Sequence, residues 1–257
     1  MKYTVLSLFP EIIDAYFATS LMAKAVSRGL VEYKSINIRD YAQDRHKTCD
    51  DAPYGGGPGM LMLAEPLDRA LTAAGASKKV PGNSVGAGTI IYLSPSGRPF
   101  NQALARELTT KEELILICGR YEGIDQRIID MYVDDEISVG DYVLSSGEAA
   151  ALVLIDATYR LVEQVITPES LKEESFQNGL LEYPQYTRPE IYDTLKVPDV
   201  LISGHHENIR RWRLQKQVEK TMRQRPDLIR QGLENGIFDA ETREIIGVIS
   251  HERDQGH

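Results

Sequence analysis

Three short loops rich in glycine and serine carry residue types from which a ligand site can be built. They are LSPSG at 93–97, CGRYEG at 118–123 and ISVGDYVLSSGE at 137–148, and each follows or lies among apolar runs of strand type. Glycine, serine and an aromatic residue at strand ends leave backbone N–H and C=O groups free to read an adenine edge and a ribose. Each loop alone is a common turn, but three along one sheet predict a ligand crevice at its carboxyl edge.

Another glycine cluster, PYGGGPGM at 53–60, lacks the context of a nucleotide loop. Gly55, Gly57 and Gly59 match the spacing G-x-G-x-G, but such a loop follows a hydrophobic strand and opens a helix. The preceding residues here, HKTCDD, are polar. We therefore reject a Rossmann-type loop and favour, over a plain rigid turn, a loop whose bare backbone approaches a flat ligand. No G-x-x-x-x-G-K-[ST] pattern supports a P-loop NTPase.

A basic stripe marks the segment 205–223, where the pattern predicts a helix. Five cations recur at spacings of three and four, which places them along one helix face: Arg210, Arg213, Lys216, Lys220 and Arg223. Between Gly204 and Arg230 there are eight Lys/Arg and three Asp/Glu, a local charge of 8 − 3 = +5 in a chain of net charge −9. Such a stripe is either a solvated face or a surface for nucleic acid, and the overall negative charge excludes neither.

Two further positions offer acid–base chemistry. Arg160 follows a stretch rich in alanine and leucine, and the pair Glu173-Glu174 precedes Ser175 in a polar segment. A carboxylate in a linker is usually a solubilising charge. It becomes a candidate base only if another part of the molecule places it against a substrate.

The elements that position these residues begin with an α/β domain. Strand-like runs at 3–9, 31–38, 89–93 and 114–118 are interleaved with helical stretches at 11–28, 65–74, 102–111 and 148–162. Alternating strands and helices imply crossover connections and a largely parallel sheet covered on both faces. Residues 1–162 are therefore predicted to form one α/β domain.

The polarity and periodicity of the sequence change at Glu163. The segment EQVITPESLKEES at 163–175 is polar and without clear periodicity, which predicts a linker. From Pro189 onward no convincing series of strands is present, whereas 205–223 and 240–250 have helical patterns. Residues 176–257 are therefore predicted to form a small all-α domain.

Composition limits the class of protein. With 42% hydrophobic and 26% charged residues, the 257-residue chain has the composition of an ordinary globular protein. No stretch reaches the roughly 20 apolar residues of a membrane span, and Glu11 and Asp14 interrupt any signal-peptide core, so we expect a cytosolic protein without membrane contact. Cys49 and Cys118 have no CxxC or Cys/His cluster beside them, which argues against a disulfide framework and a structural zinc.

The ordered motifs resemble those of the bacterial tRNA (guanine-N1)-methyltransferases, a family within the SPOUT, or trefoil-knot, methyltransferases. The similarity runs over nearly the whole chain: SLFPE, DRHKTCDDAPYGGGPGM, YLSPSGRPF, CGRYEGID, EISVGDYVL, ESFQNGLLEYPQYTRP, VPDVLISGHHENIRRWR and RPDLI. The resemblance implies a deep trefoil knot, which bottom-up topology rules would not have proposed. It also implies a homodimer whose active sites combine both subunits.

The resemblance implies an activity and a set of site residues. The activity would be transfer of a methyl group from S-adenosylmethionine to N1 of the guanine 3′ of the tRNA anticodon. The methyl donor would be held by the three loops, through Leu93, Ser94, Pro95, Gly119, Tyr121, Glu122, Gly123, Ile137, Ser138, Val139, Gly140, Asp141, Tyr142, Val143, Leu144 and Gly147. The tRNA would be held by Asp50, Tyr54, Gly55, Pro58, Gly59 and Ser175, and by the basic residues Arg210, Arg213, Lys216 and Lys220.

The family's chemical pair falls on Glu174 and Arg160. Glu174 would be the general base at N1, and Arg160 would donate hydrogen bonds to guanine O6 as negative charge forms there. The family generally has aspartate where this chain has Glu174, and the extra methylene can shift the carboxylate by more than an ångström. A magnesium requirement is also implied, although no metal-ligand cluster marks a site in the sequence.

Two alternatives remain open at this stage. One is a ribose 2′-O-methyltransferase of the same superfamily, which needs no base near guanine N1. The other is a non-catalytic tRNA-binding protein in which the aspartate-to-glutamate change has abolished turnover. A Glu174→Ala variant with full activity would favour the first, and tRNA binding without binding of S-adenosylmethionine would favour the second.

Overall fold

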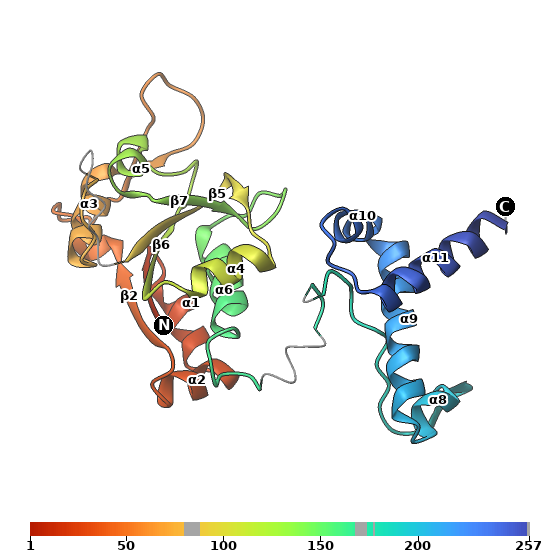
Figure 1. Ribbon diagram of the computed structural model, residues 1–257. Coiled ribbons are helices and arrows are strands. Elements are labelled where there is room, and N and C mark those ends of the chain that lie inside the picture. The colour runs from red at the N-terminus through yellow and green to blue at the C-terminus, as the bar shows by residue number, and fades with distance from the viewer. Residues whose placement is uncertain (80–87, 168–173, 177, 256–257) are drawn as a thin grey trace. The chain divides into compact units, whose positions relative to one another are not determined.

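The protein consists of two compact units. The structure, a computed structural model, describes residues 1–79, 88–167, 174–176 and 178–255 (Figure 1). The units span Met1–Ile166 and Thr167–His257. The linker predicted at 163–175 covers the junction between them, and its residues 168–173 lie outside the described part of the chain.

A parallel five-stranded sheet organises the first unit. The parallel arrangement was predicted, whereas the fifth strand, Asp135–Ser138, was not. Its order is β2-β1-β6-β5-β7, and every neighbouring pair is parallel. The strands are β1 (Lys2–Ser7), β2 (Glu32–Asn37), β5 (Thr89–Pro99), β6 (Glu113–Cys118) and β7 (Asp135–Ser138). Leu93 on β5 pairs with Cys118 on one side and with Ile137 on the other. The three predicted loops therefore lie at one edge, because two of them follow the ends of β6 and β7 and the third begins at Leu93, where the register of β5 shifts.

Helices cover both faces of this sheet (Figure 1). The first unit holds α1 (Pro10–Phe17), α2 (Ser20–Ser27), α3 (Ala64–Ala73), α4 (Gln102–Thr109), α5 (Gln126–Tyr132) and α6 (Gly147–Tyr159), with a 3-10 turn at Ile38–Tyr41. Leu114 and Leu116 of β6 belong to the core shared with α1, α4 and α6, whereas Ile115 and Ile117 belong to the core shared with α3 and α5. Alternate side chains of a strand point to opposite faces, so a strand buried on both faces is a continuous apolar run.

The single helix expected at 11–28 is wrong, because the chain forms two helices there. The break falls at Thr19, which has an extended backbone and whose hydroxyl donates to the carbonyl of Tyr16. Ser20 then adopts a positive φ of 53°. A hydroxyl that bonds back to the preceding turn competes with the helical ladder. The apolar periodicity continues across this break, and therefore does not reveal it.

The strand expected at 89–93 is longer than predicted. It continues to Pro99 after a register shift between Leu93 and Arg98, so that it passes beside β7 twice. A Cβ atom on Gly97 would lie 2.4 Å from the backbone of Glu136 and Ile137. Glycine is therefore required where the extended strand crosses its neighbour.

The described residues of the second unit form helices and one short hairpin, which was not predicted. Its elements are β8 (Ile191–Tyr192), β9 (Leu195–Lys196), α8 (Asp199–Ile202), α9 (His206–Gln224), α10 (Pro226–Glu234) and α11 (Ala240–Gln255). A separate core holds it together, with Val218 of α9 completely buried among side chains of α10 and α11. Among the described helices of the chain, none has the length and apolar character needed to cross a membrane.

Candidate functional site

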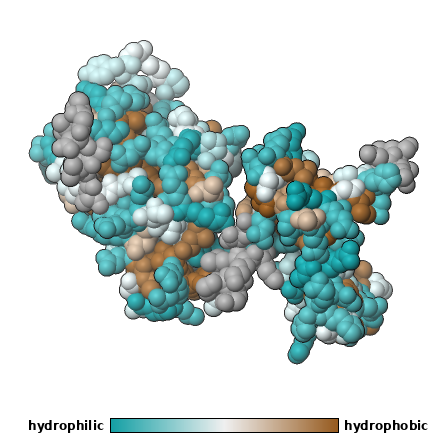
Figure 2. Space-filling model, in the orientation of Figure 1, coloured by the Kyte–Doolittle hydropathy of each residue, from teal (hydrophilic) through white to brown (hydrophobic). Residues whose placement is uncertain are grey.

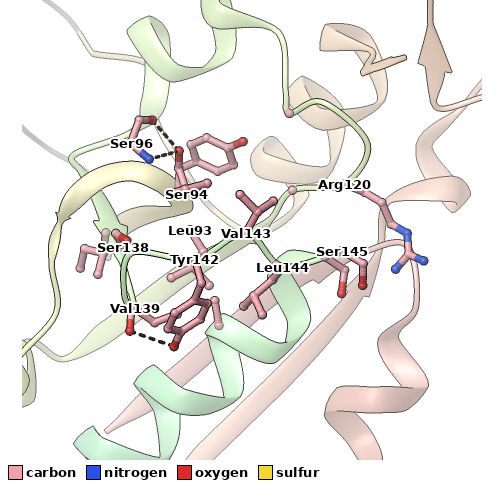
Figure 3. Close-up of a pocket in the computed structure, with 18 of the residues that line it drawn as sticks. Leu93, Ser94, Ser96, Arg120, Ser138, Val139, Tyr142, Val143, Leu144 and Ser145 are labelled. Carbon is pink, nitrogen blue, oxygen red and sulfur yellow. Dashed lines mark hydrogen bonds between the residues drawn. The ribbon is translucent and has the colours of Figure 1, made fainter. Parts of the chain in front are cut away.

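A cavity of about 530 Å³ lies where the three loops meet (Figure 3). Its size falls within the range of small-molecule sites. The lining residues are Tyr92, Leu93, Ser94, Pro95, Ser96, Gly119, Arg120, Tyr121, Glu122, Gly123, Ile137, Ser138, Val139, Gly140, Tyr142, Val143, Leu144, Ser145, Ser146, Gly147 and Ala150. Every residue predicted to hold the methyl donor is among them except Asp141, which lies beside the cavity on an exposed turn. The lining residues that were not predicted are Tyr92, Ser96, Arg120, Ser145, Ser146 and Ala150.

The loop after β6 is shaped by its glycines. A Cβ atom on Gly119 would lie 2.9 Å from the ring of Tyr92, and one on Gly123 would lie 3.3 Å from the Tyr92 hydroxyl. Between these glycines, Tyr121 has a positive φ of 58°, which is uncommon for an aromatic residue and is typical of functional loops. Burial raises the pKa of Tyr92, which therefore stays neutral. The buried ring of Tyr92 therefore packs against the backbone of this loop at Gly119 and Gly123.

The loop after β7 is folded upon itself. The Ser138 hydroxyl donates to the carbonyl of Gly140 and accepts from its N–H, and the Tyr142 hydroxyl donates to the carbonyl of Val139 at 3.1 Å. Figure 3 shows the Tyr142 ring beneath this loop. A Cβ atom on Gly140 would meet that ring at 2.4 Å. The loop therefore presents a half-exposed aromatic ring and backbone polar groups to the cavity.

Helix α6 begins directly behind the cavity. A Cβ atom on Gly147 would lie 2.7 Å from the Cα of Cys118 and from the N of Gly119, and the N–H of Gly147 donates to the carbonyl of Gly119. Burial raises the pKa of the Cys118 thiol well above its usual value, and the nearby Glu148 adds to the rise. That thiol therefore stays protonated near neutral pH and is a packing residue.

The glycine-rich loop of 53–59 joins two short antiparallel strands, β3 (Asp50–Asp51) and β4 (Leu61–Met62). It opens no helix, so the rejection of a Rossmann-type loop is confirmed. Gly55, Gly57 and Gly59 all have positive φ, and Tyr54 is fully exposed at the tip. A Cβ atom on Gly59 would overlap the side chain of Glu122.

This loop is attached to the cavity through its second strand. The N–H of Glu122 donates to the carbonyl of Met60, and the N–H of Met62 donates to the carbonyl of Gly123. The predicted tRNA-binding residues Asp50, Tyr54, Gly55, Pro58 and Gly59 therefore sit on a hairpin that borders the cavity at Glu122.

The predicted chemical pair is not assembled within the first unit. Arg160 caps the C-terminal end of α6, where it lines a second hollow of about 410 Å³ with Asp156 and Gln102. The cavity between the three loops lies at the other end of α6, at Gly147 and Ala150. Thirteen helical residues separate the ends by about 20 Å at 1.5 Å per residue. Glu174 belongs to the second unit, where it is half-buried beside Ser175, whose hydroxyl accepts from the N–H of Glu182.

The predicted cations of α9 lie in different surroundings. The Arg210 guanidinium donates to Glu207 and to Glu241, and the pKa of Arg210 rises because of these two carboxylates, Glu207 first. Lys216 donates to Glu219 at 2.6 Å. Arg213 stacks over the ring of Tyr183, and Lys220 is half-buried. The basic stripe exists, but carboxylates offset part of its charge.

The described residues contain no group of three or more His, Cys, Asp or Glu side chains that could hold a metal ion. The cavity itself is lined by backbone groups, serine hydroxyls, apolar side chains and the two charged residues Arg120 and Glu122. Such a lining suits an uncharged heterocycle with a sugar.

Comparison with known proteins identifies the family. A model of the family described as tRNA (Guanine-1)-methyltransferase TrmD matches residues 1–231. A protein of Treponema denticola named tRNA (guanine-N(1)-)-methyltransferase is 56% identical over 252 residues, which cover 98% of this chain and 100% of the relative. Relatives of the same name from Treponema pallidum and Borreliella burgdorferi are 54% and 57% identical, and they cover 98% and 91% of this chain and 97% and 95% of their own lengths. This chain therefore belongs to the TrmD family of tRNA (guanine-N1)-methyltransferases.

Proposed function

We propose that this chain is an enzyme that transfers a methyl group from S-adenosylmethionine to N1 of the guanine 3′ of the tRNA anticodon. The observation that carries the proposal is identity above one half along nearly the full length of relatives named for guanine-N1 methylation of tRNA. All three cavity loops and the hairpin beside them lie inside the matched residues 1–231.

The cavity supports S-adenosylmethionine as the methyl donor. The apolar side chains of Leu93, Ile137 and Leu144 can cover the faces of an adenine, and the loop backbones can hydrogen-bond to its edge and to a ribose. When bound, this molecule supplies an electrophilic methyl group on a positively charged sulfur. Burial raises the pKa of the Tyr92 hydroxyl and of the Cys118 thiol, so neither side chain is an anion that would compete with guanine for that methyl group.

The acid–base step is assigned to Glu174 and Arg160. The Glu174 carboxylate accepts the proton from guanine N1, whose freed electron pair forms the new N–CH₃ bond. The bound methyl donor would supply the CH₃ group and keep the electrons of its C–S bond on sulfur. Arg160 donates to guanine O6, where the negative charge of the deprotonated base collects. We assign no step to magnesium, because the described residues offer no cluster to bind it.

The position of Arg160 supports a homodimer with shared active sites. Since Arg160 and the cavity lie at opposite ends of α6, we propose that each cavity receives Arg160 and Glu174 from the partner subunit. The surface of α6 fits such a contact, because Val153 is 48% exposed beside the hollow that Arg160 lines. Figure 2 shows hydrophobic side chains gathered on the surface around α1 and α6.

The hairpin and α9 are assigned to the tRNA. Asp50, Gly55, Pro58 and Gly59 would hold the flipped-out guanine and check its neighbour, while the exposed Tyr54 ring offers a stacking surface for a base. Ser175 would contact the substrate beside Glu174. Arg210, Arg213, Lys216 and Lys220 would contact phosphates. A tRNA substrate fits a cytosolic enzyme. We also propose that the close backbone crossings at Gly97 and Gly147 belong to the family's trefoil knot.

A methylation assay tests the proposed function. The purified chain is incubated with labelled S-adenosylmethionine and anticodon-loop transcripts that carry guanine or adenine 3′ of the anticodon. We expect methylation of the guanine transcript only, and a steep loss of activity with added salt because several phosphates are neutralised. Methylation of both transcripts, or a methyl group mapped to a ribose, would reject the base-specific assignment.

A further inference from the structure

Glu148 is a buried carboxylate that the proposed chemistry does not use. It lies in the first turn of α6, one residue after Gly147 of the cavity lining, and its side chain is only 1% exposed. A helix N-terminus favours an anion, but a buried carboxylate still loses its hydration and needs partners. The surroundings of its two oxygens therefore indicate what it does.

One oxygen of Glu148 holds the end of β1. Oε1 accepts a hydrogen bond of 2.6 Å from the Ser7 hydroxyl, and the Ser7 oxygen in turn accepts from the N–H of Phe9 at 2.8 Å. These contacts link the start of α6 to the point where the chain leaves β1. They also hold the backbone of Phe9.

The other oxygen faces Arg120, a cavity residue. Glu148 Oε2 is buried without a hydrogen-bond partner, and the nearest cation is the Arg120 guanidinium, with Nη1 at 3.9 Å. That guanidinium also stacks over the Phe9 ring, 4.4 Å from its centroid. In Figure 3 the Arg120 side chain extends away from Leu93 and Val143, on the side where Ser145 lies. Arg120 therefore contributes its backbone to the cavity and directs its charge toward Glu148 behind it.

We propose that Glu148 is a positioning residue that holds the loop of residues 119–123 in the shape that receives the methyl donor. It attracts Arg120 behind the cavity, while the backbone of the same loop bonds to the start of α6, from the N–H of Gly147 to the carbonyl of Gly119. A β-bridge between Arg120 and Ser146 adds to this link. The inference rests on the proposed function, because the ligand in question is S-adenosylmethionine.

A second buried carboxylate provides a matched control. Glu113 accepts from the Thr4 hydroxyl at 2.6 Å and pairs with Lys2 at 3.0 Å, so it repeats the hydroxyl and cation partners of Glu148. It begins β6, at the sheet edge opposite the cavity. Glu113→Gln therefore measures the effect of a lost buried charge on folding alone.

The test is a double-mutant cycle on the full-length protein. S-adenosylmethionine affinity is measured by calorimetry for wild type, Glu148→Gln, Arg120→Ala and the double variant, with Glu113→Gln beside them. We expect Glu148→Gln and Arg120→Ala each to weaken the affinity about tenfold, which is 1.4 kcal/mol. The double variant should lose no more affinity than the single variant that binds S-adenosylmethionine less tightly. KM for S-adenosylmethionine should rise with Kd, while KM for tRNA stays within about twofold. Glu113→Gln should bind as wild type does.

Other outcomes separate the two claims. Additive losses, or a Glu148→Gln variant with wild-type affinity, would overturn the positioning role, because the two residues would then act independently. If Glu148→Gln does not fold, Arg120→Ala decides the matter: unchanged affinity rejects the inference, since Arg120 is 30% exposed and can be removed without opening the core. A wild-type protein that binds no S-adenosylmethionine would overturn the proposed function itself.

Discussion

Glu174 is the proposed general base, at a position where the family resemblance leads us to expect aspartate. A carboxylate one methylene longer can still reach a substrate nitrogen if its backbone yields, because the base is placed by assembly of the site and not by the cavity loops. We expect Glu174→Asp to keep kcat within about tenfold of wild type, and Glu174→Gln to lose about a hundredfold or more since it cannot accept the proton. Single-turnover methylation measures both. Glu234→Gln, an exposed carboxylate of α10, is the control. Equal rates for Glu174→Gln and wild type would remove Glu174 from the chemistry.

The sequence identified most of the cavity residues but not their supports. The loops that contain Gly119, Ile137 and Gly140 were predicted because glycine, serine and aromatic residues at strand ends are a local pattern, and the family resemblance implied the individual residues. Arg120 was missed because its partners, Phe9 and Glu148, are distant in the sequence and become neighbours only through the parallel pairing of β1 with β6. Local spacing carries no information on such contacts.

At the scale of elements, the start of α6 depends on having no side chain at Gly147. An alanine there would place its Cβ 2.7 Å from the Cα of Cys118, and a backbone neighbour cannot move aside cheaply. We expect Gly147→Ala to destabilise the protein by roughly 1 to 3 kcal/mol and to weaken binding of S-adenosylmethionine. Thermal denaturation and calorimetry measure the two effects.

Gly247 supplies the matched glycine. It lies inside α11, has nothing within 4 Å of an added Cβ, and is in the second unit. Gly247→Ala should raise stability by up to about 1 kcal/mol, because alanine favours a helix, and should leave binding unchanged. A Gly147→Ala protein as stable as wild type would show that the crossing of α6 and β6 can relax.

The start of α5 carries a pH-dependent contact. Asp125 caps this helix through the N–H of Arg127 and also accepts from the Arg127 side chain, which holds the pKa of Asp125 below its usual 3.8. A depressed carboxyl pKa means that the stabilisation is complete above the unfolded pKa and is lost as the pH falls through the folded value. Asp125→Asn should therefore lower Tm near neutral pH by up to about 3 °C.

The comparison across pH tests this assignment. The difference in Tm between wild type and Asp125→Asn should shrink as the pH falls through the lowered pKa of Asp125 in the folded protein, and vanish where the aspartate is protonated. Glu112→Gln, an exposed carboxylate just before β6 in the same unit, should show no such pH-dependent difference. A difference that is constant with pH would assign the contact to cap geometry and not to charge.

Helices and strands could be predicted from the sequence where a single hydrophobic periodicity dominated. The buried strands and the helix at Gly147–Tyr159 were recognised because apolar runs and alanine-rich stretches are unambiguous. α5 and β8 were not recognised: α5 has seven residues and β8 two, too few for a period to show. The break at Thr19 was hidden by apolar residues that continue the helical spacing on both sides.

At the scale of the molecule, the order of the sheet was beyond sequence reasoning. The alternation of strands and helices predicts a parallel sheet. The strand order β2-β1-β6-β5-β7, however, depends on which face of the sheet each crossover connection passes. The family resemblance implied a trefoil knot but gave no strand order. The two units have separate cores, and the residues proposed for proton transfer and for the methyl donor are divided between them. We therefore predict that catalysis depends on assembly beyond a single cavity.

Subunit complementation tests whether the active site is shared. Two differently tagged chains are co-expressed, one with Gly140→Val, which displaces the Tyr142 ring from the cavity loop, and one with Glu174→Gln. In a heterodimer with shared sites, one site combines the intact cavity of the Glu174→Gln chain with Glu174 of its partner. That site should be active, so the purified heterodimer should recover about half of the wild-type activity by symmetry, while each mutant homodimer stays inactive. If every site were completed within one chain, both sites of the heterodimer would carry a defect, and no activity would return.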